Sequence, residues 1–118
     1  MVLDALEVGP RRGGHRTPGR LPAEMQPSVD RAVLDASVRV RDQAVQALMK
    51  LDCADFAAQV GLRLDDSDDS VRLSAIRALG RFRAQTFAER LRVIAENDPI
   101  ESTRETARAA LLHMSTPE

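Results

Sequence analysis

The pattern of apolar and polar positions predicts helices along most of the chain. Val71, Ala75, Ala78, Leu79 and Phe82 fall at i, i+4, i+7, i+8 and i+11, so they share one continuous face of a helix. No run of residues alternates with the period of two that indicates a strand. Two more helices are expected to present the same face, made of Val40, Ala44, Ala47, Leu48 and Leu51 and of Thr103, Ala107, Ala110, Leu111 and Met114.

These faces belong to a sequence repeat. AVQALMKL at 44–51 matches AIRALGRF at 75–82 at an offset of 31, and ARAALLHM at 107–114 follows at a further offset of 32. An arginine precedes each copy, and an aspartate stands six residues before that arginine. The three aspartate–arginine pairs are Asp35 and Arg41, Asp66 and Arg72, and Asp98 and Arg104. A unit made of a turn and a helix therefore occurs three times.

A second, more variable helix precedes each repeated helix. The two together predict three helical hairpins, at residues 25–51, 55–82 and 86–114. A hairpin of this size cannot bury its apolar faces alone, so the hairpins must stack against one another. The predicted fold class is therefore all-α, a short right-handed α-solenoid of three helical hairpins that occupies residues 28–118.

The N-terminal segment has a different composition. Between Gly9 and Glu24 the chain holds four glycines, three prolines and four arginines, with Leu21 as its one large aliphatic residue. Such a segment cannot bury enough apolar surface to offset the entropy lost on ordering, so we expect residues 1–27 to form a flexible tail. The preceding MVLDALEV, at 1–8, lacks the positive charge of a secretory signal and the length of a membrane span, so we expect no membrane association.

The middle unit, DDSDDSVRLSAIRALGRF at 65–82, resembles a HEAT repeat, particularly the short bacterial HEAT-like variety also found in phycobilisome lyase-type proteins. The resemblance extends over residues 28–114. It implies that the turn aspartate and the arginine six residues later form a ladder between successive repeats, so that Asp66 with Arg72 would hold the repeats in register. It also implies that the repeated helices line a concave surface, where such proteins usually hold a partner.

The third unit departs from the second at two positions. It has Thr103 in place of Val71, and Leu112 in place of Gly80. A large side chain at the glycine position leaves two readings of the C-terminal helix: it either caps the stack or forms an edge that awaits another repeat or a partner. A homodimer through this C-terminal helix is therefore one option.

The acidic stretch LDDSDDSVR, at 64–72, resembles a metal-binding site more than any other part of the sequence does. A calcium-binding loop counted from Asp66 would need glycine at its sixth position and glutamate at its twelfth, where this chain has valine and arginine. The stretch more simply begins a helix. We expect Asp69 or Ser70 to accept hydrogen bonds from the free N–H groups of the first turn, and Asp66 to face an arginine.

The composition of the chain argues against several classes of function. Seventeen Lys and Arg against eighteen Asp and Glu give a formal charge of -1, so no global field attracts nucleic acid or an anionic membrane. The single cysteine, Cys53, excludes an internal disulfide and suits a reducing compartment such as the cytoplasm. The chain has no glycine-rich phosphate loop, no Ser-His-Asp arrangement and no zinc-ligand spacing. We therefore expect no enzymatic activity, no cofactor and no metal.

The exposed positions of the repeated helices form the candidate partner-binding surface. Its expected residues are Gln43, Gln46, Lys50, Ser74, Arg77, Arg81 and His113. We predict a non-catalytic scaffold that binds a protein partner through this surface. Two alternatives stay open: a lyase-like or regulatory subunit associated with an enzyme, as the resemblance implies, and weak nucleic-acid binding through the Arg-rich tail with Arg77, Arg81 and Arg83.

Overall fold

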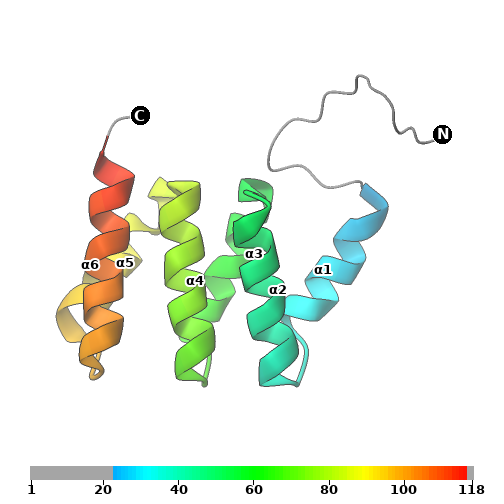
Figure 1. The fold of residues 1–118 in the computed structure, drawn as a ribbon, viewed down its shortest axis with the longest axis horizontal. Coiled ribbons are helices and arrows are strands. Elements are labelled where there is room, and N and C mark those ends of the chain that lie inside the picture. The colour runs from blue at the N-terminus through cyan, green and yellow to red at the C-terminus, as the bar shows by residue number, and fades with distance from the viewer. Residues whose placement is uncertain (1–22, 117–118) are drawn as a thin grey trace.

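The computed structural model describes residues 23–116, which fold into helical hairpins stacked side by side (Figure 1). Within this part of the chain there are six α-helices and no strand, so the chain is a small all-α solenoid. The expected tail lies outside the described residues up to position 22. From Ala23 the chain is already helical, since a 3-10 turn at Ala23–Met25 leads directly into the first α-helix.

Each hairpin consists of a leading helix and a repeated helix. The first hairpin contains α1 (Gln26–Val33) and α2 (Val38–Lys50). The second contains the 3-10 turn Ala54–Phe56, α3 (Ala57–Gly61), the 3-10 turn Leu62–Asp65 and α4 (Asp69–Phe82). The third contains the 3-10 turn Gln85–Phe87, α5 (Ala88–Asn97) and α6 (Glu101–Ser115).

The helices form two layers. The repeated helices α2, α4 and α6 run side by side in one layer, and α3 and α5 lie behind them in Figure 1. α2 packs against α4, α4 packs against α6, and α5 packs against α6. The main contacts of each hairpin are therefore with its neighbours, and stability is shared along the stack.

The core between the layers is aliphatic. Ile76 and Leu79 of α4 are fully buried, as are Val45 of α2 and Leu91 of α5. Each such side chain contributes about 1.5–3 kcal/mol relative to an exposed position. The large aliphatic residues of the sequence repeat therefore supply the driving force for stacking.

Two glycines allow close packing between hairpins. A Cβ atom placed on Gly80 of α4 would lie 2.7 Å from Cβ and 3.0 Å from Cα of Ala110 on α6. A Cβ atom on Gly61 of α3 would lie 2.3 Å from two ring carbons of Phe87. The backbones of α4 and α6 therefore approach as closely as they do because position 80 has no side chain.

Side chains cap the starts of α2 and α4, whereas the N-cap residue of α6, Ile100, makes no side-chain hydrogen bond. Ser37 accepts a hydrogen bond from the N–H of Val40 at the start of α2. Asp68 accepts from the N–H groups of Ser70 and Val71 at the start of α4. The expected cap at Asp69 or Ser70 is therefore wrong, because the helix begins at Asp69 and its cap is the extended residue before it, Asp68.

The ends of α2 and α4 share one geometry. Asp52 and Arg83, which are equivalent at the offset of 31, both adopt left-handed backbone conformations, with φ of 54° and 53°. The next residue then donates its N–H back into the helix, from Cys53 to the carbonyl of Leu48 at 2.9 Å in the first case. This closure is the Schellman type of helix end, and it places the side chain of Asp52 beside α4.

Candidate functional site

The repeated aspartate and arginine perform the same local task in all three units. Each aspartate carboxylate accepts a hydrogen bond from the N–H two residues later, and each arginine donates through Nη1 to the backbone carbonyl of its aspartate. The N–H bonds measure 2.8 Å at Asp35, 2.9 Å at Asp66 and 2.9 Å at Asp98. The arginine bonds measure 2.9 Å from Arg41, 2.8 Å from Arg72 and 2.6 Å from Arg104. The motif therefore closes the turn within each hairpin.

Between the first two hairpins the same motif forms an ion pair. Arg41 donates to the carboxylate of Asp66 through Nε at 2.7 Å and Nη2 at 2.9 Å, and Arg63 donates to it through Nη1 at 2.9 Å. The carboxylate side chain is 1% exposed. Burial raises the pKa of Asp66, but hydrogen bonds from Arg41, the N–H of Asp68 and Arg63 lower it, and the net pKa lies below the ordinary value.

This arrangement corrects the expected pairing of Asp66 with Arg72. The guanidinium of Arg72 contacts the backbone carbonyl of Asp66, while the carboxylate of Asp66 takes its arginine from the preceding hairpin. Arg41 and Asp66, the two partners that the structure pairs, are both buried. The arginine of one repeat reaches the aspartate of the next because stacking brings them together.

The second and third hairpins lack the corresponding ion pair. Arg72 donates through Nη2 to the carboxylate of Asp69, on its own helix. Among residues 23–116 no ion pair joins Arg72 to Asp98. The first hairpin has Val38 at the position of Asp69, so nothing there competes for its arginine. The extra acidic residues of LDDSDDSVR therefore divert one arginine of the ladder.

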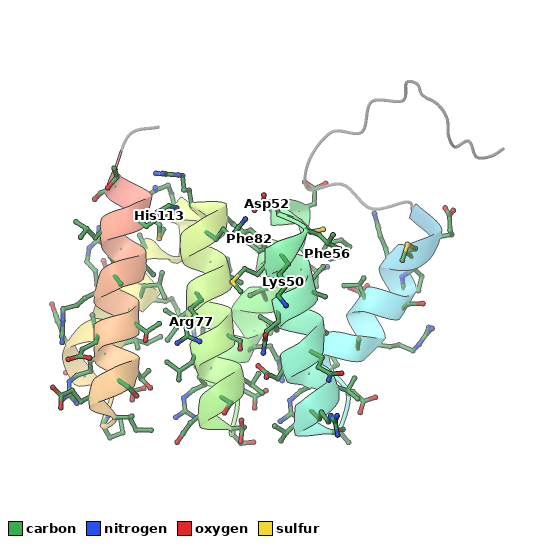
Figure 2. The ribbon with its side chains drawn as sticks, in the orientation of Figure 1. Lys50, Asp52, Phe56, Arg77, Phe82 and His113 are labelled. Atoms are coloured by element: carbon green, nitrogen blue, oxygen red, sulfur yellow. The ribbon has the colours of Figure 1, made fainter. Side chains whose placement is uncertain are left out.

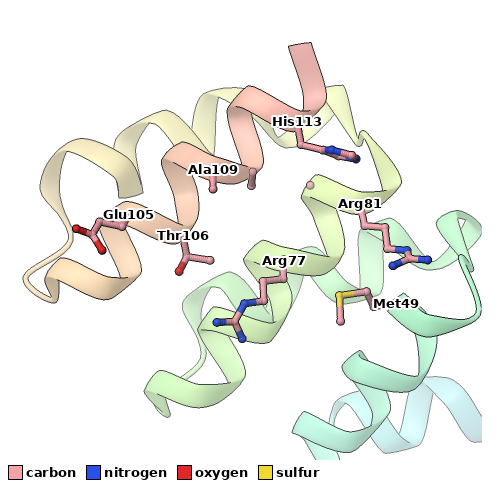
Figure 3. Close-up of a pocket in the computed structure, with 9 residues that line it drawn as sticks. Met49, Arg77, Arg81, Glu105, Thr106, Ala109 and His113 are labelled. Carbon is pink, nitrogen blue, oxygen red and sulfur yellow. The ribbon is translucent and has the colours of Figure 1, made fainter. Parts of the chain in front are cut away.

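A groove opens on the face formed by α2, α4 and α6, with a volume of about 490 Å³ (Figure 3). We call it the α4–α6 groove. Its lining residues are Met49 of α2, Arg77, Gly80 and Arg81 of α4, and Glu105, Thr106, Ala109, Ala110 and His113 of α6. Gly80 packs closely against Ala110 at the bottom of this space, and Ala109 of α6 adds only a small side chain to it.

Three of the predicted partner-binding residues lie around this groove: Arg77, Arg81 and His113. Arg81 donates through Nε to a carboxylate oxygen of Asp52 at 2.8 Å, and this hydrogen bond raises the pKa of Arg81. Arg77 projects from α4 at the rim (Figures 2 and 3) and has no hydrogen-bond or ion-pair partner within the described part of the chain. Its guanidinium charge therefore faces solvent.

The remaining predicted residues separate into two groups. Gln43, Gln46 and Lys50 lie along a second hollow on α2, of about 450 Å³, away from the α4–α6 groove. Ser74 is only 5% exposed, and its hydroxyl donates to the carboxylate of Asp42 at 2.5 Å. Its prediction as a partner-binding residue is therefore wrong, because α2 packs over this side of α4.

Sequence reasoning missed the apolar floor of the groove, formed by Met49, Gly80 and Ala110. The sequence held one indication of this floor, because the offset of 31 places Met49 and Gly80 at equivalent positions of neighbouring helices. Nothing in the sequence separates Ala110 from the other buried alanines. Its role at the groove depends on the distance between α4 and α6.

Arg83 has a structural role at the last hairpin. Its Nη1 donates to the carbonyl of His113 at 2.7 Å and to the carbonyl of Thr116. These bonds bring a charged donor to carbonyl groups at the C-terminal end of α6. Arg83 therefore holds α4 to the end of α6, and most of the Arg-rich tail that was grouped with it lies outside the described residues.

Comparison with known proteins gives one match. The family model described as HEAT repeats matches residues 25–112. No curated protein and no solved structure matches the chain. None of the helices in residues 23–116 is long and apolar enough to cross a membrane. In the same residues no group of three or more His, Cys, Asp or Glu side chains is placed to hold a metal ion.

Proposed function

Because the chain belongs to the HEAT-repeat family, whose members commonly serve as protein-interaction scaffolds, we propose that it is a non-catalytic scaffold that binds a protein partner through the α4–α6 groove. The observation that carries the proposal is the groove itself. It combines an apolar floor with charged side chains at its rim, on the layer of repeated helices.

The chemistry of the groove resembles that of protein-binding hot spots. Such sites place an aromatic or aliphatic anchor in a desolvated pocket, and arginine is enriched among their energetic residues. Met49, Gly80 and Ala110 offer an apolar floor, and Arg77 offers an exposed guanidinium that has no hydrogen-bond or ion-pair partner among residues 23–116. A partner that inserts an apolar side chain there would bury the floor and place a carboxylate near Arg77.

The charges around the groove indicate which residue types the partner segment carries. Arg77 and Arg81 lie on the α4 side of the groove, and Glu105 and His113 lie on the α6 side. Arg81 already pairs with Asp52, whereas Arg77 does not have such a pair among the described residues. The proposed partner segment therefore carries one acidic residue next to one large apolar residue, and Arg77 is its main charged contact.

The test is capture of partners from native lysate by the wild-type protein and by the double variant Arg77→Glu with Arg81→Glu. Both side chains are exposed, so the variant should stay folded, which its melting curve verifies. The matched control reverses Arg90 and Arg92, two exposed arginines of α5 in the other layer. We expect the control to retain the partner and the groove variant to lose it; an unchanged set of partners would contradict the proposal.

A further inference from the structure

The outer face of α2 carries apolar side chains that residues 23–116 leave open to solvent. Val40 is 37% exposed, whereas Val71, the equivalent residue of α4, is fully buried. Leu51 of the same face is 59% exposed. Because Val40 and Val71 are the same residue type, the difference lies in the missing neighbour. We call this surface the N-terminal end face, and its residues are Asp35, Val40, Gln43, Ala47 and Leu51, all of them exposed.

The other end of the stack has a second open face, on α6. Figure 1 shows α2 in the hairpin at one end of the stack and α6 in the hairpin at the other. Leu112 of this second face is a large apolar residue, and it is 69% exposed. We call the surface the C-terminal end face, and its residues are Arg104, Glu105, Arg108 and Leu112. The stack therefore exposes apolar side chains at both of its ends.

The contact between α2 and α4 shows how two such faces pack together. Arg41 donates to the carboxylate of Asp66, and the hydroxyl of Ser74 donates to the carboxylate of Asp42. Met49 lies beside α4, with which it lines the α4–α6 groove. The first hairpin therefore meets the second with an arginine, an acid and a long apolar residue. The C-terminal end face has the same residue types at the same three positions, at an offset of 63: Arg104, Glu105 and Leu112.

The N-terminal end face likewise matches the surface that receives α2. On the second hairpin that surface includes Asp66, Ser74 and the buried Ala78. Its counterparts on the first hairpin, at an offset of 31, are Asp35, Gln43 and Ala47. Both sets hold an aspartate, a side chain that can donate a hydrogen bond, and an alanine. The two end faces are therefore matched to each other in the way that the first two hairpins are.

Two residues of the C-terminal end face differ from what α4 presents to α6, and neither prevents packing. At the position of Leu112, α4 has a glycine but α2 has Met49, and α2 packs on α4 all the same. Arg108 stands where α2 has Val45. Its Nη1 donates to the carbonyl of Ala95 at 3.0 Å, which turns its charge toward α5.

The hollow on α2 is a separate sign of a missing neighbour. Four of its residues, Gln43, Gln46, Ala47 and Lys50, occupy the positions of Thr106, Ala109, Ala110 and His113, which belong to the α6 wall of the α4–α6 groove. In that groove the opposite wall belongs to α4 of the preceding hairpin. The hollow on α2 is therefore one wall of such a groove, and a hairpin placed before α2 would supply the other.

Each end face also carries a charge without a partner from a neighbouring hairpin. Among residues 23–116 the carboxylate of Asp35 accepts only the N–H of Ser37. Arg104 donates through Nη1 to the carbonyl of Asp98 at 2.6 Å, and its guanidinium makes no other hydrogen bond in this part of the chain. Glu101 precedes Arg104 by three residues, but no ion pair joins the two among the described residues. One end therefore presents an acceptor and the other a donor of opposite charge.

We propose that copies of this chain stack end to end, with the C-terminal end face of one copy on the N-terminal end face of the next. The three assigned contacts are Arg104 with Asp35, Glu105 with Gln43, and Leu112 with Ala47. The association joins two different surfaces, so each copy keeps one open face and can bind a further copy. It therefore differs from a homodimer through α6 alone, and it does not rest on the binding of a partner in the α4–α6 groove.

Sedimentation equilibrium of the full chain tests the stacking. We expect the mass of the wild type to rise with concentration beyond that of a dimer, whereas Ala47→Glu and Leu112→Glu each stay monomeric, because each blocks one face. An equimolar mixture of these two variants should form a dimer with one copy of each, since each supplies the face that the other lacks. Ala58→Glu, at an exposed alanine of α3, should associate like the wild type. Unchanged melting curves of the variants show that the loss is one of association.

Three results would overturn the proposal. The first is a wild-type protein that stays monomeric at millimolar concentration. The second is a mixture of the Ala47→Glu and Leu112→Glu variants that stays monomeric. The third is a dimer that Leu112→Glu dissociates and Ala47→Glu does not, because α6 would then pair with α6.

The mixed dimer also allows the assigned ion pair to be measured. Its one contact uses Arg104 of the Ala47→Glu copy and Asp35 of the Leu112→Glu copy. Arg104→Gln in the first copy and Asp35→Asn in the second should each weaken association at least about tenfold, and together no more than either alone, because the two groups act as one pair. Asparagine keeps an acceptor for the N–H of Ser37. Additive effects of the two changes would overturn the contact of Arg104 with Asp35.

Discussion

Replacing Asp66 with alanine removes the carboxylate that joins the first two hairpins. The side chain is 1% exposed, and it accepts hydrogen bonds from Arg41, from Arg63 and from the N–H of Asp68. Removing one partner of a buried ion pair typically costs about 3–5 kcal/mol, because the other partner stays desolvated. Arg41 keeps its bonds to two backbone carbonyls of the preceding turn, so we expect a cost near the lower end, about 3 kcal/mol.

Asp35→Ala is the matched control, because Asp35 occupies the same position in the first repeat. Its carboxylate is exposed and accepts one backbone hydrogen bond from Ser37, so its loss should cost about 1 kcal/mol or less. Both variants are compared with wild type by urea and thermal unfolding followed by circular dichroism. At roughly 4–8 °C per kcal/mol, Asp66→Ala should lower the melting temperature by about 12–24 °C. Equal losses in the two variants would refute the reasoning that the Asp66 carboxylate joins the hairpins.

Three further predictions concern packing and charge. Gly80→Ala should destabilise the fold by about 1 kcal/mol in urea unfolding, because overlap with Ala110 outweighs the gain in helix propensity; a stabilised variant would contradict the close approach of the two helices. Thr103→Val should stabilise the fold by about 1 kcal/mol in the same assay, since the buried hydroxyl lacks a hydrogen-bond partner among the described residues and Val71 fills the equivalent position; a loss of stability would indicate that the hydroxyl is bonded. The folded-state pKa of Asp66 lies below its ordinary value, so its contribution is present above about pH 4 and is lost as the pH falls through the folded pKa; the free energy of unfolding measured from pH 6 to pH 2 should fall more steeply in wild type than in Asp66→Ala.

The sequence predicted the fold because its periodicity is local. The spacing of Val71, Ala75 and Ala78 predicts one helix face, and its recurrence at offsets of 31 and 32 predicts the stack. The family match over residues 25–112 and the all-α structure confirm the predicted family and fold class. Helix-forming patterns and repeats can be recognised in a sequence without knowing which distant residues are in contact.

The partners of individual side chains depend on stacking, and they were predicted less well. The spacing of six residues singled out Asp66 and Arg72, but which arginine reaches the carboxylate follows from the position of Arg41 on the neighbouring hairpin. Ser74 lies on a polar position of its helix, yet α2 covers it. The α4–α6 groove likewise arises from the distance between two helices, which Gly80 and Ala110 set together.

Site-directed photo-crosslinking from the α4–α6 groove is the most direct test of the proposed scaffold function. A photo-reactive amino acid is placed at Ala109, which lines the groove, and in a second variant at Val93, which is 50% exposed on α5 in the other layer. After irradiation in native lysate, we predict a discrete crosslinked partner from position 109 that is absent from position 93 and that disappears when Arg77 is changed to Glu. Equal crosslinking from both positions, or a partner captured only from position 93, would contradict binding through the groove.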